Sequence, residues 1–127
     1  MRRRRDAGMA TAEIAMALPA LVLVAAIVLW GVAVASVRLA CSDAARGGAR
    51  AAARGESLAA VRSLVEHAVP PGARVTVHRD GEASRVEVAV PVPPPVAAGL
   101  PALTVTARAV AATEPGADSV PVTDLSP

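Results

Sequence analysis

A long run of uncharged residues near the N-terminus is the dominant pattern in this chain. From Ile14 to Val37 there are 24 consecutive residues without Asp, Glu, Lys or Arg. A helix of that length spans about 36 Å at about 1.5 Å per residue, enough to cross a hydrocarbon core roughly 30 Å thick with some tilt. A soluble helix is rarely apolar on every face over such a length. The pattern therefore predicts a membrane span over residues 14–37.

Small residues continue the helical pattern beyond this span. They recur at every fourth position, as Ser36, Ala40, Ala44, Gly48 and Ala52. This spacing lets helices approach closely, although the abundance of alanine in the chain explains the stripe equally well. A second row, on another face, consists of Arg46, Arg50 and Arg54. Gly47-Gly48 is a weak point, where an early end of the helix is one outcome, and Gly55 is the expected break.

The rest of the chain predicts a small head of residues 56–112. Ser57 is suited to cap a second helix that runs to about His67. Its apolar face consists of Leu58, Val61, Leu64, Val65 and Ala68. Alternating valines on both sides of a turn at residues 79–84 predict a β-hairpin, and Leu103–Ala111 predicts a third strand. Five prolines between residues 91 and 101 make the connection irregular.

These elements together predict an α+β fold: a long N-terminal helix over residues 9–55, then a short helix and a small antiparallel sheet. Residues 113–127 are rich in Pro, Ser, Thr and Asp, and are predicted to be disordered. Ala and Val account for 51 of the 127 residues, and there is one Trp but no Phe or Tyr. The core must therefore be built from small side chains, and a head of this size is marginal on its own.

Three kinds of membrane segment fit the N-terminal pattern. The first is a permanent, uncleaved anchor. The second is a secretory signal, in which Arg2–Arg5 form the basic region and cleavage falls after Ala35, within Ala33-Val34-Ala35-Ser36. The third is a short leader, residues 1–8, that is cut on the cytoplasmic side ahead of the apolar run.

The third possibility is favoured by the residues around Gly8. Gly8 ends a short basic segment, and a cut between Gly8 and Met9 would make Glu13 the fifth residue of the mature chain. This arrangement resembles type IV pilins, whose leaders end in Gly and whose mature chains carry Glu at the fifth position of a hydrophobic helix. Residues 12–19 (AEIAMALP) and 43–53 (DAARGGARAAA) are more specifically similar to TadE-like minor pilins or pseudopilins of the Tad (Flp-type) pilus system.

The resemblance implies a structural and assembly component rather than an enzyme. It would be a substrate of a prepilin peptidase, and its partners would be other pilin subunits and a pilus assembly platform with its ATPase. The implied location is the cell membrane, with one span, a cytoplasmic N-terminus and an extracytoplasmic C-terminus, or an extracellular pilus after assembly. The alternative, which belongs to another functional class, is a secreted or membrane-anchored envelope protein with a conventional signal sequence.

The resemblance suggests specific roles for two residues of the apolar helix, Glu13 and Pro19. Glu13 could pair with the α-amine that cleavage frees at Met9 of a neighbouring subunit, and so set the register between helices. The simpler alternative is that Glu13 only marks the membrane interface. Pro19 removes a backbone donor and clashes with the carbonyl of Ala15, so we expect a kink or local loosening there.

Catalytic or metal-binding chemistry is not indicated by the remaining residues. His67 and His78 are the only histidines, and no spacing with Ser63 or Asp80 supports a catalytic triad. Two His and one Cys give no metal-ligand pattern, so we expect no metal and no cofactor. Nucleic-acid binding is not expected either, because aromatic residues for base stacking are almost absent. Cys41 is interpreted as a buried packing residue, with cross-linking between subunits as the alternative.

Overall fold

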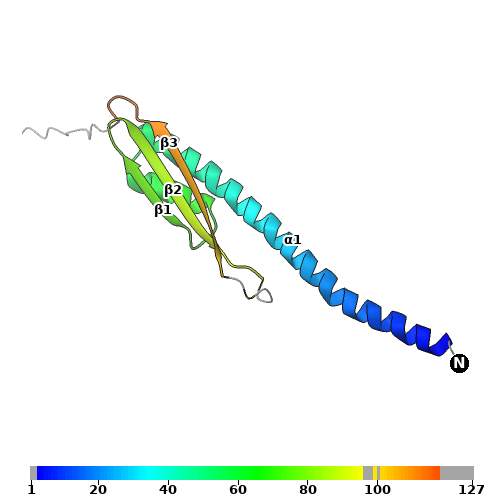
Figure 1. Cartoon of the computed structure of the whole chain (residues 1–127). Coiled ribbons are helices and arrows are strands. Elements are labelled where there is room, and N and C mark those ends of the chain that lie inside the picture. The colour runs from blue at the N-terminus through cyan, green and yellow to red at the C-terminus, as the bar shows by residue number, and fades with distance from the viewer. Residues whose placement is uncertain (1–2, 96–98, 100, 118–127) are drawn as a thin grey trace, which may run out of the picture.

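The computed structural model describes residues 3–95, 99 and 101–117. Helix α1 (Arg3–Ala53) is followed by helix α2 (Leu58–Ala68) and by strands β1 (Arg74–Arg79), β2 (Ala83–Val92) and β3 (Leu103–Ala112). The head gathers around the C-terminal half of α1, and the N-terminal half extends beyond it as a single rod (Figure 1). This α+β architecture is the one that the sequence pattern predicts.

Helix α1 is continuous over 51 residues. An early end at Gly47-Gly48 does not occur, because the head packs against this part of the helix and outweighs the low helix propensity of glycine. The helix ends where expected, just before Gly55, whose φ of 89° lies in the left-handed region that glycine adopts without strain.

Helix α2 begins at the predicted cap. The Ser57 hydroxyl accepts a hydrogen bond from the Ala60 backbone N–H at 3.2 Å, which satisfies one of the free amides at the helix start. Val61 and Val65 are buried, at 0 % and 1 % exposure, whereas Leu58 and Leu64 remain largely exposed. The buried face of α2 is therefore narrower than the sequence pattern predicts.

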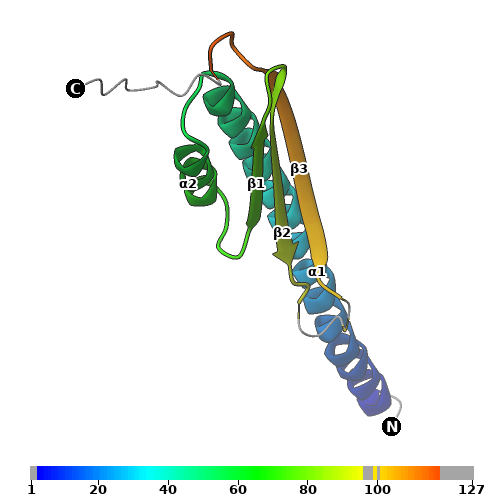
Figure 2. The same ribbon diagram turned by 90° about the vertical axis from the view of Figure 1, so that its left-hand side faces the viewer.

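The three strands form one antiparallel sheet in the order β1-β2-β3. The predicted hairpin is confirmed, with Val75 opposite Val88 and Val77 opposite Val86. Strand β3 pairs along the whole length of β2, from Val92 opposite Leu103 to Ala83 opposite Ala112. One face of the sheet covers α1, and α2 lies beside β1 and α1 (Figure 2).

The core consists almost entirely of alanine and valine, as the composition requires. Strands β2 and β3 contribute Val86, Val88, Val90, Val92, Val105 and Ala107. Helix α1 contributes Cys41, Ala44, Ala45, Ala49, Ala51 and Ala52. The segment Cys41–Ala53 of α1 thus forms one wall of the core of the head.

The start of the C-terminal tail is ordered, contrary to the predicted disorder from residue 113. The Thr113 N–H donates to the Glu82 carbonyl at 3.0 Å, and the Glu114 N–H donates to the Ala53 carbonyl at 2.9 Å. The Thr113 hydroxyl also lies 3.0 Å from that of Ser84, which is fully buried. Residues 113–117 thus close the end of the head, while 118–127 lie outside the described residues.

Candidate processing and assembly region

The N-terminal half of α1 presents an apolar surface that no other part of the described chain covers. Its most apolar window of 18 residues has a mean hydropathy of 2.7 and is not buried. The large side chains on it are 44 % to 79 % exposed, and include Ile14, Met16, Leu18, Leu21, Leu23, Ile27 and Leu29. A surface of this size needs an apolar environment. One helix of the described chain is therefore long and apolar enough to span a membrane.

The residues of the predicted cleavage site lie at the start of this helix. Gly8 and Met9 have helical backbone, and Glu13 is exposed one turn further along. The side chain of Met9 lies outside the described residues, whose side chains begin at Glu13. The structure thus places all three residues on one continuous helix, on the N-terminal side of the exposed apolar surface.

Pro19 lies inside α1, and the helix passes through it without interruption. Proline at this position leaves the carbonyl of Ala15 without its usual helical donor. The expected kink or loosening stays a prediction, because helical assignment alone does not fix the bend. Any bend at Pro19 would change the direction of the exposed half without moving the head.

The stripe of small residues is used inside the chain. Ala44, Gly48 and Ala52 are buried by the head, whereas Ser36 is exposed and Ala40 only half-buried. A Cβ atom on Gly48 would come within 2.5 Å of Val65 Cγ2 and 3.4 Å of Val86 Cγ2. The C-terminal part of the stripe, from Ala44 to Ala52, therefore lets α2 and the sheet approach α1. Only the N-terminal part, Ser36 and Ala40, is left for contact with other helices.

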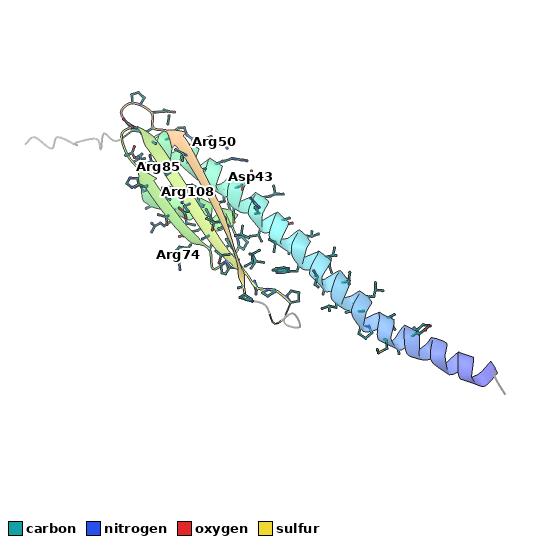
Figure 3. All side chains as sticks on the ribbon, in the orientation of Figure 1. Asp43, Arg50, Arg74, Arg85 and Arg108 are labelled. Atoms are coloured by element: carbon teal, nitrogen blue, oxygen red, sulfur yellow. The ribbon has the colours of Figure 1, made fainter. Side chains whose placement is uncertain are left out.

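Asp43 and Arg50 lie on the side of α1 away from the sheet (Figure 3). Arg46 is 3.7 Å from Asp43, and Arg54 forms an ion pair with Glu56 at 2.8 Å. These pairs are exposed, so they stabilise the fold little. The arginine row is therefore exposed in the described chain, which is compatible with both roles expected for it, a solvated face and a contact with partners.

Cys41 is fully buried in the core. Burial raises the pKa of its thiol, which keeps the reactive thiolate scarce. The packing role is thus confirmed, and a cross-link between subunits through Cys41 is not possible without opening the head.

Arg79 is a structural residue that sequence reasoning missed. Its guanidinium reaches from the end of β1 to the end of α1, where Nη1 donates to the carbonyl oxygens of Ala52 at 2.9 Å and Glu56 at 2.8 Å. The Ala52 carbonyl lies in the last turn of α1 and also accepts from the Gly55 N–H at 3.0 Å, and Glu56 lies in the connection between α1 and α2. Arg79 therefore links the end of β1 to the end of α1 and to this connection. The only sequence signal was an arginine at the first position of the predicted turn, which does not reveal a contact 27 residues away.

The exposed face of the sheet is polar and carries arginines from all three strands, labelled as Arg74, Arg85 and Arg108 in Figure 3. Arg108 pairs with Glu87 at 2.8 Å, and Arg85 pairs with Asp80 at 2.6 Å. The Ala83 backbone N–H, and after it the Arg85 guanidinium, lower the pKa of Asp80 to about 2. Asp80 is thus committed to the β1–β2 turn.

The described residues form no catalytic constellation around the two histidines. The Nδ1 atom of His67 lies 2.7 Å from the Ser63 carbonyl oxygen on its own helix, and His78 Nε2 lies 4.0 Å from Asp80. Within the described segments, no three His, Cys, Asp or Glu side chains gather to hold a metal ion. The distinctive feature of this part of the molecule is an uncharged helical surface that follows directly after Glu13.

Comparison with known proteins shows similarity to a mycobacterial protein. The chain is 42 % identical over 107 residues to a protein named apoptosis inhibitor Rv3655c from Mycobacterium tuberculosis (strain ATCC 25618 / H37Rv). The alignment covers 82 % of this chain and 78 % of the relative. No protein-family model matches the chain, and no solved structure matches it at a significant level.

Proposed function

This chain belongs to the family of the mycobacterial apoptosis inhibitor Rv3655c, and we propose that it acts as a minor pilin or pseudopilin of a Tad-type pilus system. In this role it is a structural and assembly component. A prepilin peptidase removes residues 1–8, and the mature chain stays anchored in the membrane by α1 until assembly. Its head then faces the extracytoplasmic side.

One arrangement carries the proposal. Gly8, Met9 and Glu13 lie on the same continuous helix as the exposed apolar surface, and that helix leads directly into a compact head. A cut after Gly8 therefore leaves a mature chain whose fifth residue is the acidic side chain that precedes the span. The small α+β head on the C-terminal half of the helix supports the same function, since it is the general layout of pilins.

The helical backbone at Gly8 and Met9 sets a condition for cleavage. The first turns of α1 must unwind before an enzyme reaches the peptide bond between them, because the helix engages its backbone groups in hydrogen bonds. Helix ends fray readily, and glycine costs about 1 kcal/mol of helix stability relative to alanine. Gly8 thus eases the local opening that processing requires.

Glu13 supplies the recognition step in the assembled state. Cleavage frees an α-amine at Met9, whose reference pKa is about 7.7–8.0, so most of it is protonated at neutral pH. In a bundle of apolar helices, the Glu13 carboxylate of one subunit pairs with this amine on a neighbour. Such a pair selects one register among apolar faces that would otherwise slide. The partners are thus other pilin subunits, together with the assembly platform and its ATPase.

The processing step is tested by replacing Gly8 and measuring the intact mass of the membrane-bound chain. Gly8→Asp is expected to block cleavage and leave a chain eight residues longer than the wild-type product. Gly31→Ala is the matched control, because Gly31 lies on the same helix and an added Cβ meets nothing within 4 Å. Both variants are first shown to reach the membrane fraction. Normal processing of Gly8→Asp would refute the proposal.

The name of the relative favours a second candidate, a protein that inhibits apoptosis, which we combine with the conventional secretory signal that the N-terminal pattern also fits. Export through a conventional signal would require cleavage after Ala35. Trp30 and Val34 pack against the core of the head, so that cut removes contacts that the structure uses. The two candidates are separated by the first residue of the mature protein, which is Met9 in the pilin-like case and Ser36 in the exported case.

A further inference from the structure

The two edges of the sheet are protected to different degrees. Strand β1, at one edge, has six residues and an arginine at each end, and α2 lies alongside it, where Leu58 and Val77 line a common hollow. Strand β3, at the other edge, has ten residues, no proline or glycine, and Arg108 as its one charged side chain. No other described element lies on the outer side of β3 (Figure 2). Proteins usually shield a long edge strand, because its free backbone groups pair readily with another chain.

The register of the sheet identifies the backbone groups that this edge offers. The Thr113 N–H donates to the Glu82 carbonyl, and these two residues continue the β2–β3 register by one pair. Hydrogen-bonded and non-hydrogen-bonded pairs alternate along an antiparallel ladder. Odd-numbered residues of β3 therefore bond to β2, and even-numbered residues direct their N–H and C=O groups outward. Within the described chain, no partner binds the outward backbone groups of Thr104, Thr106, Arg108, Val110 and Ala112.

A hollow lies beside the first half of this edge, between β3 and α1. It has a volume of about 300 Å³, and its lining consists of Val34 and Arg38 of α1 and residues 103–106 of β3. A strand added to β3 would continue the pleat of the sheet, so every second side chain would point toward α1, as those of Val105 and Ala107 do. The side chains of such a strand would therefore enter the hollow.

Arg38 determines which side chain fits there. Its own side chain is exposed and, among the described residues, forms no hydrogen bond or ion pair. The next arginines along α1 differ, because Arg46 lies 3.7 Å from Asp43 and Arg54 pairs with Glu56. Val34, one turn before Arg38, is apolar and half-buried. A strand that fills the hollow is thus complementary when it places a carboxylate beside Arg38 and an aliphatic side chain beside Val34.

The direction of β3 argues against a second copy of this chain as the added strand. The start of β3 lies beside Val34, and the Glu114 N–H, just after its end, donates to the Ala53 carbonyl, so β3 runs in the same direction as α1 (Figure 1). Two copies anchored by α1 in one membrane therefore present parallel β3 strands, and antiparallel pairing of these edges is not possible. A two-fold axis along the strands would place each N–H opposite the same N–H of the other copy, which excludes hydrogen bonds.

We propose that the outer edge of β3 binds an extended segment of a partner protein as a fourth, antiparallel strand. In this segment an acidic side chain meets Arg38 and is followed, two residues later, by an aliphatic side chain beside Val34. Backbone hydrogen bonds supply the affinity and the hollow supplies the selectivity. The inference goes beyond the proposed function and uses only its membrane anchoring. Its test involves neither cleavage after Gly8 nor assembly, so failure of the one leaves the other standing.

The test measures peptide binding by the full-length chain in nanodiscs of phosphatidylcholine, which adds no net charge. The probe is a fluorescein-labelled peptide of sequence TVTDTVTVT, in which the acidic residue precedes an aliphatic one by two positions. The control peptide, TVTKTVTVT, carries lysine in place of the aspartate. Fluorescence anisotropy should show that the acidic peptide binds about tenfold more tightly than the control peptide, because it alone pairs with Arg38. Arg38→Glu should reverse this preference.

The strand pairing is tested by Thr106→Pro, which removes an outward N–H that the β2–β3 ladder does not use. This variant should weaken binding of the acidic peptide by about tenfold, whereas Thr106→Ala, the matched control, keeps the N–H and should bind as the wild type does. Circular dichroism checks that each variant is folded, and the preference of Arg38→Glu decides the question if Thr106→Pro is not.

Three results would overturn the inference. The first is no binding of the acidic peptide at about 1 mM, which is weaker than specific strand addition. The second is an equal affinity for the two peptides in both the wild type and Arg38→Glu. The third is a dimer of the wild type in detergent micelles that Thr106→Pro abolishes and Thr106→Ala retains, since the edge would then belong to a second copy.

Discussion

The N-terminal and C-terminal halves of α1 have opposite environments. Residues 14–29 hold large aliphatic side chains, and most of that surface is exposed. Residues 41–53 hold six alanines, two glycines and a cysteine among their thirteen positions, and most of these are buried by the head. The difference is one of side-chain size: small residues let a sheet and a second helix come close to the helix axis, whereas large ones present area to a lipid or a partner.

The largest expected effect comes from placing the same large side chain in each half. Ala45 is 0 % exposed, and Ala45→Leu should destabilise the head by about 3 kcal/mol because the close-packed core has no room for it. Ala25→Leu, in the exposed half, should change the stability by less than about 0.5 kcal/mol. Urea unfolding of the full chain in detergent micelles measures both. Equal changes in the free energy of unfolding for the two variants would show that the two halves of α1 do not differ in how closely they are packed.

A smaller effect is expected from two adjacent glycines. Gly48→Ala should destabilise the head by about 1–2 kcal/mol, because its Cβ would meet Val65 Cγ2 at 2.5 Å. Gly47→Ala meets nothing within 4 Å and should stabilise the helix by up to about 1 kcal/mol. The same unfolding measurement applies. A stabilising Gly48→Ala would mean that the head does not need this close approach.

The smallest effect concerns the turn between β1 and β2, which contains the charged residue Asp80. Residues 14–29 of α1, in contrast, have no charged side chain. The pKa of Asp80 is lowered to about 2 from an ordinary value of 3.8. Because the folded value is the lower one, the Asp80 contribution to stability is present above about pH 4 and is lost as the pH falls through about 2. The amide chemical shift of Ala83, which donates to the Asp80 carboxylate at 2.7 Å, should titrate with a midpoint near 2. A midpoint near 3.8, or an unchanged titration in Asp80→Asn, would contradict this.

Local patterns predicted the elements of the head well. Alternating valines at positions such as Val75 and Val88 set both the strands and their register, because a strand with one buried face has only one suitable phase. The Ser57 cap and the break at Gly55 followed from single residues with specific backbone roles. These features depend on neighbours in the sequence, so the sequence suffices to predict them.

The features that the sequence did not predict depend on contacts between distant segments. Gly47-Gly48 looked like a helix end, but Gly48 lies opposite Val65 and Val86, which hold the helix in place. The tail was predicted to be disordered from Thr113, yet its N–H finds a carbonyl at Glu82. For the same reason, Arg79 gave no sign that it would hold the end of α1. The candidate cleavage site is the reverse case, since Gly8 and Glu13 are proposed from the sequence alone and cleavage there stays a prediction.

The first residue of the mature, membrane-bound chain decides whether this protein is processed as a pilin. Intact mass and N-terminal sequencing of the wild-type protein from the cells that produce it give this residue without any substitution. We expect a chain that begins at Met9 and retains the whole apolar half of α1. A chain that begins at Ser36, or one that still carries Met1 to Gly8, would contradict it.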